Sequence, residues 1–576
     1  MPCGCAATGV ASPTVIAADS TFRLDANFVD YLIVVAYFAV VLGIGLLARR
    51  QVSSSIDFFL SGRSLPAWVT GLAFVAANLG AVEIMGMSAN GAQYGMATAH
   101  YFWVGAVPAM LFLGVVMMPF YYGSGVRSVP EFMRKRFGTG AHLVNALSFA
   151  IAQLLIAGIN LFLLATIVNR LLGWSLWVSL VVAAAIVLSY TALGGLSAAI
   201  YNEVLQFFVI VAALVPLTTI ALHKVGGWDG IREQIQPGPE QLSSWPGTDL
   251  TGIDNPFWSV VGIVFGLGFV LSFGYWTTNF VEVQRAMAAD SISAARRTPI
   301  IGAFPKMFIP FVVIIPGMIA AIIVPELAAL KGGDAVEGVT YNDAILLLMR
   351  DLLPNGMLGI AIAGLLASFM AGMAANISAF NTVFSYDLWQ QYAVKDREDS
   401  YYTKVGRLAT VAATVVAIGT AFIASNYSNL MDYLQTLFGF FNAPLFATFI
   451  LGMFWKRMTP TAGWTGLVSG TLAAIVVAIL SQDALGGLSL GVLPFSGQGA
   501  SFAAAGAAFV VDIAVSVAVT FVTAPKPEKQ LVGLVYSLTP KESLTDPDQA
   551  SLPWYQSPVK LAGIALVIVI IFNVIF

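Results

Sequence analysis

The stretch FVAANLGAVEIMG, residues 74–86, lies inside a long apolar segment of a 576-residue chain. It places an amide, a glycine and a carboxylate, Asn78, Gly80 and Glu83, near the centre of that segment. A carboxylate is costly at membrane depth, and glycine weakens a helix. Unwinding the helix here would expose backbone carbonyls to a cation and helix ends to a solute. We therefore expect an interrupted helix whose polar side chains line a solute cavity.

The composition is that of a membrane protein. The chain is 58% hydrophobic and only 10% charged, against about 25% charged residues in soluble domains. The mean hydropathy of +0.84 excludes an ordinary water-soluble enzyme. The net charge of −3 gives no indication of a nucleic-acid partner. The sequence holds no nucleophile–base pair, metal cluster or phosphate-binding loop, so we expect no catalytic residues.

Apolar segments long enough to cross a bilayer recur along the whole chain. They predict an all-α polytopic membrane protein with about fourteen transmembrane helices in contact with lipid. The predicted spans are 28–48, 69–90, 101–121, 144–168, 176–192, 204–222, 257–280, 300–325, 356–383, 405–425, 430–453, 462–481, 501–523 and 558–575.

The distribution of basic residues predicts the orientation. Of the 27 Lys and Arg residues, twenty fall on one set of loops and six on the other, while Lys306 lies inside a span. The richer set should be cytoplasmic, which places both termini outside a plasma (inner) membrane. The N-terminal tail 1–27 and the loop 223–256 are then extracellular, and the Pro-rich, charged linker 524–557 is cytoplasmic.

Ionisable residues inside spans usually face a cavity or a partner. Glu83, Lys306 and Asp512 are the deepest, and for Asp512 we expect hydrogen bonds between helices. A second group lies near predicted helix ends, where capping or snorkelling is the expected role: Glu203, Glu282, Asp387 and Asp432.

A second glycine-interrupted span is GIVFGLGFVLSFGYWTTNF, residues 262–280. If helix 28–48 stands outside a repeat, the two interrupted spans lead two five-helix units. Paired discontinuous helices at matching positions indicate a transporter binding site at the bilayer midplane. The alternative is that the glycines only permit close helix packing.

Several motifs together resemble the sodium:solute symporter family, nearest to its sodium/glucose (galactose) cotransporter branch. They are DFFLSGRSLPAW (57–68), AANLG (76–80), SVPEFMRKRF (128–137), YTALGGLSAAIYNEVLQ (190–206), GYWTTNFVEVQR (274–285), YLQTLFGFFNAP (433–444) and FWKRM (454–458). The resemblance implies a LeuT-type 5+5 inverted-repeat core that works by alternating access. The repeats would span 57–222 and 257–455, after the leading extra helix 28–48 and before peripheral helices in 456–576.

The resemblance also implies a sugar site. Four residues match sugar-site or gate positions of the branch, with Tyr275 at the inner gate; Glu83 stands where relatives have Gln or His. Such a set offers hydrogen bonds to hydroxyl groups and a flat face to the sugar ring. The implied substrate-binding residues are Asn78, Glu83, Ser272, Tyr275, Trp276, Lys306 and Gln435.

One residue departs from the branch pattern. Relatives carry a glutamate in the third span, and here Phe102 of HYFWV (100–104) occupies that place. Either Glu83 supplies a carboxylate from across the cavity, or the substrate is another hexose, a polyol or a less hydroxylated solute.

The implied sodium site departs as well. Its backbone carbonyl positions are Ala76, Leu79 and Ser368, and its two hydroxyl positions hold Ala371 and Gly372. Hard cations demand oxygen ligands, so the loss of two hydroxyls weakens the site. Glu203 matches an aspartate near this site in relatives. Three alternatives follow: weak Na⁺ coupling, proton coupling through Glu203 or Glu83, or uncoupled facilitation.

The expected function is secondary active symport of a sugar-like solute, a hexose such as galactose or glucose. The solute would move inward with a cation, with Na⁺ favoured over a proton. The alternatives are a solute sensor or uncoupled facilitator with the same fold, or a symporter of a different polyol-like solute.

Overall fold

The computed structural model describes residues 23–49, 61–80, 82–124, 126, 128–245, 249–251, 255–334, 336–427, 429–482, 488–544 and 552–576. Its regular elements within these ranges are helices, with one isolated β-bridge between Leu65 and Ala289. Most of the tail 1–27 and part of the linker 524–557 lie outside the described residues.

The first half of the chain forms α1 (Phe28–Arg49), α3 (Ala67–Asn78), η2 (Val82–Gly86), α4 (Met87–Tyr94), η3 (Gly95–Ala99), η4 (Tyr101–Ala106), α5 (Val107–Phe112), η5 (Leu113–Met117), α6 (Met118–Gly123), α7 (Val129–Phe137), α8 (Thr139–Leu172), α9 (Leu176–Val225) and α10 (Gly227–Gln234). The second half forms α11 (Pro256–Val261), η8 (Gly262–Ser272), α12 (Phe273–Thr278), α13 (Phe280–Met287), α14 (Ile292–Ile323), α15 (Pro325–Lys331), α16 (Ala344–Leu352), α17 (Met357–Thr382), η10 (Val383–Ala393), α18 (Asp399–Ala424), α19 (Leu430–Phe454), α20 (Pro460–Leu480), α21 (Gly497–Val522), α22 (Lys541–Leu544) and α23 (Pro558–Ile575).

The predicted spans correspond to helices. Among the described residues, twelve helices are long and apolar enough to cross a membrane. The bent pair Ala67–Asn78 and Val82–Ala99 makes a thirteenth when it counts as one span. The predicted span 176–192 differs, because it is the first part of the continuous helix α9. Its apolar portion Leu176–Ser189 is too short to be counted as a span by itself.

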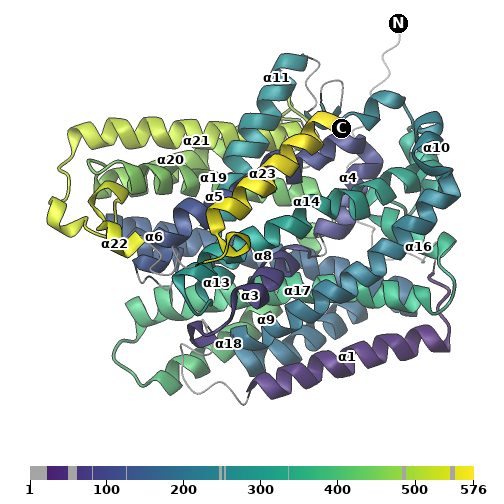
Figure 1. The fold of residues 1–576 in the computed structure, drawn as a ribbon, viewed down its shortest axis with the longest axis horizontal. Coiled ribbons are helices and arrows are strands. Elements are labelled where there is room, and N and C mark those ends of the chain that lie inside the picture. Colours follow the sequence, from purple (N-terminus) through teal and green to yellow (C-terminus); the bar gives the residue numbers. More distant parts are fainter. Residues whose placement is uncertain are drawn as a thin grey trace, which may run out of the picture.

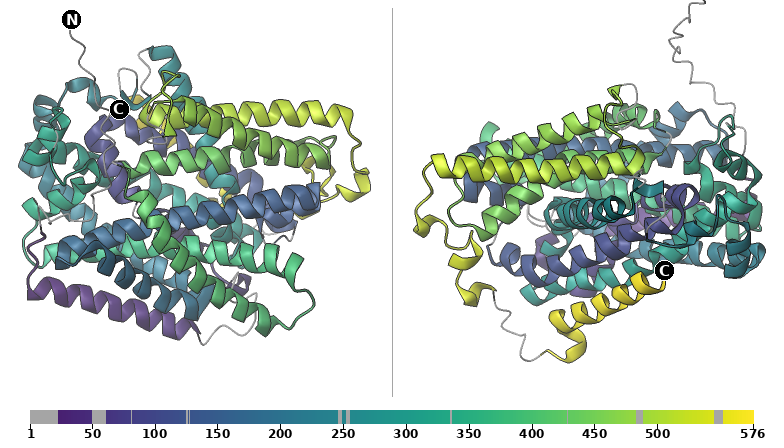
Figure 2. Two further views of the ribbon diagram at one scale, coloured as in Figure 1. Left: turned by 180° about the vertical axis from the view of Figure 1, so that it is seen from behind. Right: turned by 90° about the horizontal axis from the view of Figure 1, so that it is seen from above.

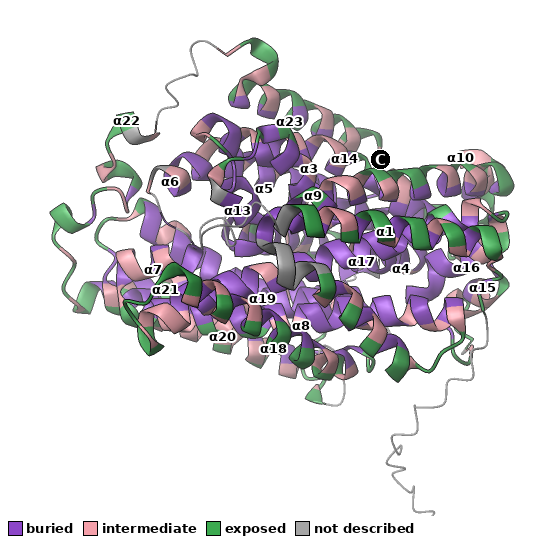
Figure 3. Ribbon diagram, turned by 90° about the horizontal axis from the view of Figure 1, so that it is seen from below, coloured by how far each residue is buried: buried purple, intermediate pink, exposed green. Residues whose placement is uncertain are grey.

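The long helices run along a common axis (Figures 1 and 2). The short helices α10, α15 and α16 gather at one end of this bundle, and α7 and α22 lie at the other (Figure 3). Both described chain ends lie at the first end. Leu24 N–H donates to the carbonyl of Arg170 at the end of α8, and Ser244 N–H donates to the carbonyl of Phe576. The two termini therefore lie on the same side as the loop 223–256.

The centre and the periphery of the bundle differ in burial (Figure 3). In its most apolar stretch α17 is 89% buried, whereas α1 is 28% and α23 is 22% buried. The exposed positions of α1 include Phe28, Val35 and Leu47, which are apolar. Helices with an exposed apolar surface suit contact with lipid, and the buried centre is the place for polar side chains.

The break that residues 74–86 predict is present. Helix α3 ends at Asn78, helical structure resumes as a π-helix at Val82, and the two axes differ by 58°. A π-helical segment at such a place is often associated with a functional site.

The second predicted interruption is wrong in position. Residues 262–278 continue as helix, π-helical from Gly262 to Ser272, and the chain turns only at Asn279, which is extended and caps α13. The glycines serve close packing instead. A Cβ at Gly266 would lie 2.9 Å from the Cβ of Phe502, and one at Gly268 would lie 2.8 Å from a methyl carbon of Val104.

Candidate functional site

A cavity with an inner volume of about 90 Å³, partly open to solvent, lies beside the break after α3. All seven substrate-binding residues predicted from the sequence line it, although they come from six elements, α3, η2, η8, α12, α14 and α19. They are Asn78, Glu83, Ser272, Tyr275, Trp276, Lys306 and Gln435.

Lys306 is the centre of the polar contacts in this cavity. Its side chain is 1% exposed, and its Nζ donates to Glu83 Oε1 at 2.6 Å and to Asn78 Oδ1. Glu83 is 14% exposed, toward the cavity. A buried ammonium requires a partner of opposite charge, and Glu83 supplies it. The break after α3 positions both partners, because it turns the amide of Asn78 and the carboxylate of η2 toward α14.

Phe102, which replaces the glutamate of the resembled branch, contributes to the same cluster. The Lys306 Nζ lies 5.0 Å from the centroid of the Phe102 ring and 5.3 Å from that of Trp276. A cation within about 6 Å of an aromatic face is attracted by the ring quadrupole. Phe102 itself is fully buried behind the lysine. Glu83 is therefore the carboxylate of this cluster, as one of the two sequence-based alternatives proposed.

Tyr275 closes one wall of the cavity. Its hydroxyl accepts from Asn78 Nδ2 at 3.0 Å and donates to Glu282 Oε1 at 2.7 Å. Its ring packs on Phe438 with 4.6 Å between centroids. Glu282 was expected to cap or snorkel at a helix end, and this expectation is wrong: the residue is fully buried and binds the tyrosine hydroxyl. Sequence depth alone could not show that its side chain turns inward.

The remaining predicted residues, Gln435, Ser272 and Trp276, have modest contacts. Gln435 Nε2 donates to Met431 Sδ at 3.4 Å, a weak interaction that leaves the amide available to a ligand. The hydroxyl of Ser272 lies where a side chain at position 105 would be, since a Cβ at Gly105 would be only 2.2 Å from it. Trp276 packs its ring 5.6 Å from Phe74.

Leu79 and Ser368, two of the predicted cation positions, meet where α17 passes the break. Ser368 Oγ donates to the carbonyl of Leu79 at 2.5 Å, which shows that this carbonyl faces α17. Ala76 and Ala371 are fully buried, and Gly372 reaches the cavity wall. Positions 371 and 372 offer no side-chain oxygen, as the sequence indicates.

Glu203 was proposed to approach the cation or to carry a proton. In the structure its two oxygens accept from Arg285, Oε1 from Nη2 at 2.5 Å and Oε2 from Nε at 3.3 Å, and both side chains are buried. A bidentate guanidinium–carboxylate pair compensates both charges. In this structure Arg285 compensates the charge of the Glu203 carboxylate, and a coupling role for Glu203 stays a prediction.

Asp512 confirms its predicted role between helices. Its Oδ2 accepts from Thr448 on α19 at 2.7 Å, and its Oδ1 accepts from Ser516 on α21 at 3.1 Å. The carboxylate is fully buried away from the cavity.

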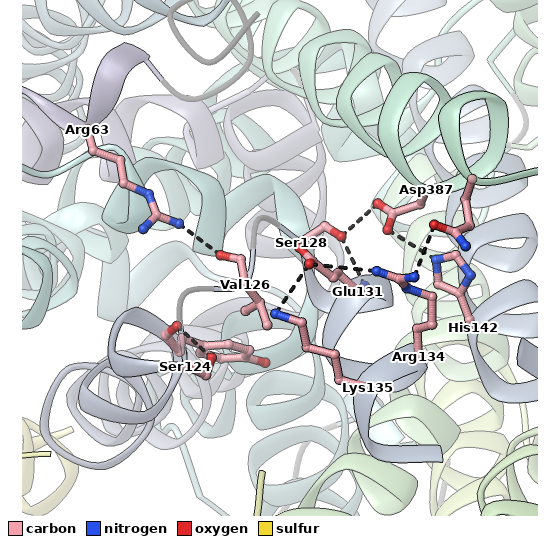
Figure 4. Close-up of polar contacts among 11 residues, drawn as sticks. Arg63, Ser124, Val126, Ser128, Glu131, Arg134, Lys135, His142 and Asp387 are labelled. Carbon is pink, nitrogen blue, oxygen red and sulfur yellow. Dashed lines mark hydrogen bonds and ion pairs between the residues drawn. The ribbon is translucent and has the colours of Figure 1, made fainter. Parts of the chain in front are cut away.

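A second polar cluster lies at the end of the bundle that holds α7 (Figure 4). Asp387 accepts from Ser128 Oγ at 2.6 Å and lies 3.1 Å from His142 Nε2. His142 Nδ1 is 2.6 Å from the hydroxyl of Tyr392. Ser128 also caps α7 by accepting from Glu131 N–H. Asp387 therefore does not cap a helix end as expected but joins α7, α8 and η10.

The chain is similar to known transport proteins. The model of the sodium:solute symporter family matches residues 58–470. A sodium/glucose cotransporter of Vibrio parahaemolyticus is 30% identical over 471 residues, 79% of this chain and 85% of that protein. Sodium/glucose cotransporter 4 of Danio rerio is 30% identical over 558 residues, 91% of this chain and 83% of that protein.

A solved structure shares the fold. A Na⁺-coupled sialic acid symporter in a substrate-bound outward-open state matches with a TM-score of 0.70 at 19% identity, over 87% of this chain and 99% of that chain. The family model covers more than half of the residues, and its matched region contains all predicted site residues. The chain belongs to the sodium:solute symporter family.

Proposed function

We propose that this protein is a sodium-coupled symporter that moves a hexose-type sugar inward by alternating access. The observation that carries the proposal is the buried Lys306 ammonium, held by Asn78 and Glu83 in a cavity beside an interrupted helix. The similarity to sodium/glucose cotransporters over most of the chain supports the substrate class and the ion.

The cavity residues would contact different parts of a sugar. Lys306 and Asn78 donate hydrogen bonds to hydroxyl oxygens, while Glu83 accepts from hydroxyl hydrogens. Gln435 can do both, and the rings of Tyr275 and Trp276 offer apolar faces to the C–H side of the ring. Without bound solute, the charges of Lys306 and Glu83 neutralise one another, so neither side chain needs a counter-ion.

Sodium enters this scheme as a second substrate. The carbonyls at Ala76, Leu79 and Ser368 are proposed to bind it where α17 passes the break, beside positions Ala371 and Gly372. Because a cation there links α17 to the helix that carries Asn78, its occupancy favours one state of the cavity over another. A ligand couples to a conformation only through such a difference in affinity.

The topology is proposed along with the function. Both termini are extracellular in a plasma (inner) membrane, with the loop 223–256 outside and the linker 524–557 in the cytoplasm. The two inverted repeats span 57–222 and 257–455. Helix 28–48 precedes them and the segment 456–576 supplies peripheral helices.

The test is uptake of labelled galactose and glucose into proteoliposomes, with a sodium gradient or a proton gradient imposed in separate experiments. Accumulation driven by sodium is expected. Lys306→Ala should abolish it, whereas Lys456→Ala, which removes an exposed lysine paired with Glu528, should not. Accumulation driven by protons alone would contradict sodium coupling. Binding without accumulation in either gradient would indicate a sensor, and equilibration without accumulation an uncoupled facilitator.

A further inference from the structure

The cation positions lack two hydroxyl ligands, and the structure places another oxygen beside them. Asn160, in the middle of α8, is 4% exposed and lines the cavity wall. Its Nδ2 donates to the carbonyl of Ile156 at 3.2 Å. That carbonyl can only accept, so the amide nitrogen must face it and the oxygen must point away. This Oδ1 is buried and has no hydrogen-bond partner among the described residues.

The unpartnered oxygen points at two glycines. A Cβ built on Gly372 would lie 2.9 Å from Asn160 Oδ1, and a Cβ built on Gly80 would lie 3.2 Å from it. The same Cβ at Gly372 would lie 3.1 Å from the Cα of Gly80. The oxygen therefore occupies the space between α8, the break and α17 that any side chain at position 372 would need.

Other oxygens meet at this point. The carbonyl of Leu79 and the hydroxyl of Ser368 face one another across the same contact between the break and α17. Helix α3 ends at Asn78, so the negative end of its dipole is directed at this region. A buried amide oxygen without a partner is unfavourable, and a bound cation would supply the missing partner.

We propose that Asn160 Oδ1 is a sodium ligand that replaces the hydroxyl missing at position 372. The proposal rests on the sodium site of the proposed function. The amide oxygen is a neutral, hard donor of the same class as the backbone carbonyls around it. Glycine at 372 is then a requirement of the substitution, because a hydroxyl-bearing residue and Asn160 cannot both occupy this space.

The experiment measures sodium binding without sugar. Purified full-length protein is titrated with ²²Na⁺ by scintillation proximity, and its thermal midpoint is compared in NaCl and in choline chloride of equal concentration. Asn160→Ala is expected to weaken sodium binding on the order of tenfold or more and to remove the sodium-dependent rise in the midpoint. The matched control is Asn145→Ala, because Asn145 is also buried in α8 with an unpartnered Oδ1 but lies about four turns away.

Three further variants keep the test decisive. In Asn160→Ala with Gly372→Ser, the vacated space admits a hydroxyl, so sodium affinity should recover relative to Asn160→Ala alone. Gly372→Ser by itself should weaken binding, because the new side chain meets Asn160. Asn160→Asp keeps the shape and adds charge beside the ion, so it should bind sodium at least tenfold more tightly than the wild type.

The outcomes separate this inference from the proposed function. Wild-type sodium binding that neither Asn160→Ala nor Asn160→Asp alters would overturn the role of Asn160 and leave sodium coupling intact. A wild type that binds no sodium at all would overturn both. If Asn160→Ala fails to fold, the affinity of Asn160→Asp relative to the wild type decides the question.

Discussion

We propose that Tyr275 is the inner gate that the family resemblance implies, and its contact with Glu282 predicts that the opening of this gate responds to pH. Glu282 lies in α13, after the preceding span ends at Thr278. Burial raises the pKa of its carboxyl to about 7, against the opposing effects of the Tyr275 hydrogen bond and of Arg285 and Lys306. The neighbouring carboxylate of Glu203 acts in the same direction as burial. Above about pH 7 the ionised carboxylate holds the tyrosine hydroxyl, and protonation as the pH falls weakens that hold.

The size of the effect follows from the hydrogen bond. A bond to a charged acceptor contributes about 1.5–3 kcal/mol and a neutral one about 0.5–1.5 kcal/mol. Protonation of Glu282 therefore removes about 1.4 kcal/mol from the closed gate, a factor of roughly ten in its opening equilibrium. Glu282→Gln leaves a neutral acceptor of the same shape, so it fixes the gate in its low-pH state.

The assay is equilibrium exchange of labelled sugar across proteoliposomes between about pH 6 and pH 8, a window that brackets this pKa. Wild-type exchange should be roughly fivefold faster at the low end, because protonation is incomplete at either limit of this window, and Glu282→Gln should be fast and flat across the range. Glu326→Gln, a change at a half-exposed carboxylate outside the cavity, is the control and should keep the wild-type profile. Identical pH profiles for the wild type and Glu282→Gln would refute the reasoning.

Three further predictions concern stability, each measured as the thermal midpoint of purified protein. Glu83→Gln leaves the buried Lys306 ammonium without its anion and should lower the midpoint, whereas adding Lys306→Met should restore most of the loss, because removing both charges of a buried pair is close to neutral. Arg285→Lys should also lower it, since a lysine cannot reproduce the two parallel bonds to Glu203. Asp512→Leu strands the buried hydroxyl of Thr448 at about 1–3 kcal/mol, whereas Ser516 can still donate to the carbonyl of Ala462, and it should destabilise the α19–α21 contact. An unchanged midpoint in Glu83→Gln or in Asp512→Leu would contradict the respective argument. So would a double variant, Glu83→Gln with Lys306→Met, whose midpoint is no higher than that of Glu83→Gln alone.

The sequence was most informative about features that depend on residues close together along the chain. Apolar length sets where a span begins and ends, and an amide, a glycine and a carboxylate within six residues predict the break after Asn78. Glycine content was less reliable, since residues 262–278 stay helical. There the glycines allow close packing against residues such as Phe502 and Val104, and a single sequence does not show which residues are neighbours in space.

Side-chain partners were the part that sequence could not supply. Glu203 and Glu282 lie at similar distances from predicted helix ends, yet one is paired with Arg285 and the other binds Tyr275. Asn160 was not identified at all, because one amide in a long apolar helix has many structural roles. Its lack of a partner becomes visible only when α8, α17 and the break are placed together.

The contacts from Lys306 to Glu282 form a chain in which every hydrogen points the same way. Lys306 donates to Asn78, Asn78 donates to Tyr275, and Tyr275 donates to Glu282. A solute group inserted into such a chain must accept a hydrogen bond from one neighbour and donate a hydrogen bond to the next. Otherwise the chain of hydrogen bonds is interrupted. A hydroxyl does both, whereas an ammonium cannot accept and a carboxylate cannot donate. The polarity of this chain therefore favours uncharged, hydroxylated solutes, in keeping with the sugar-like substrate that we propose.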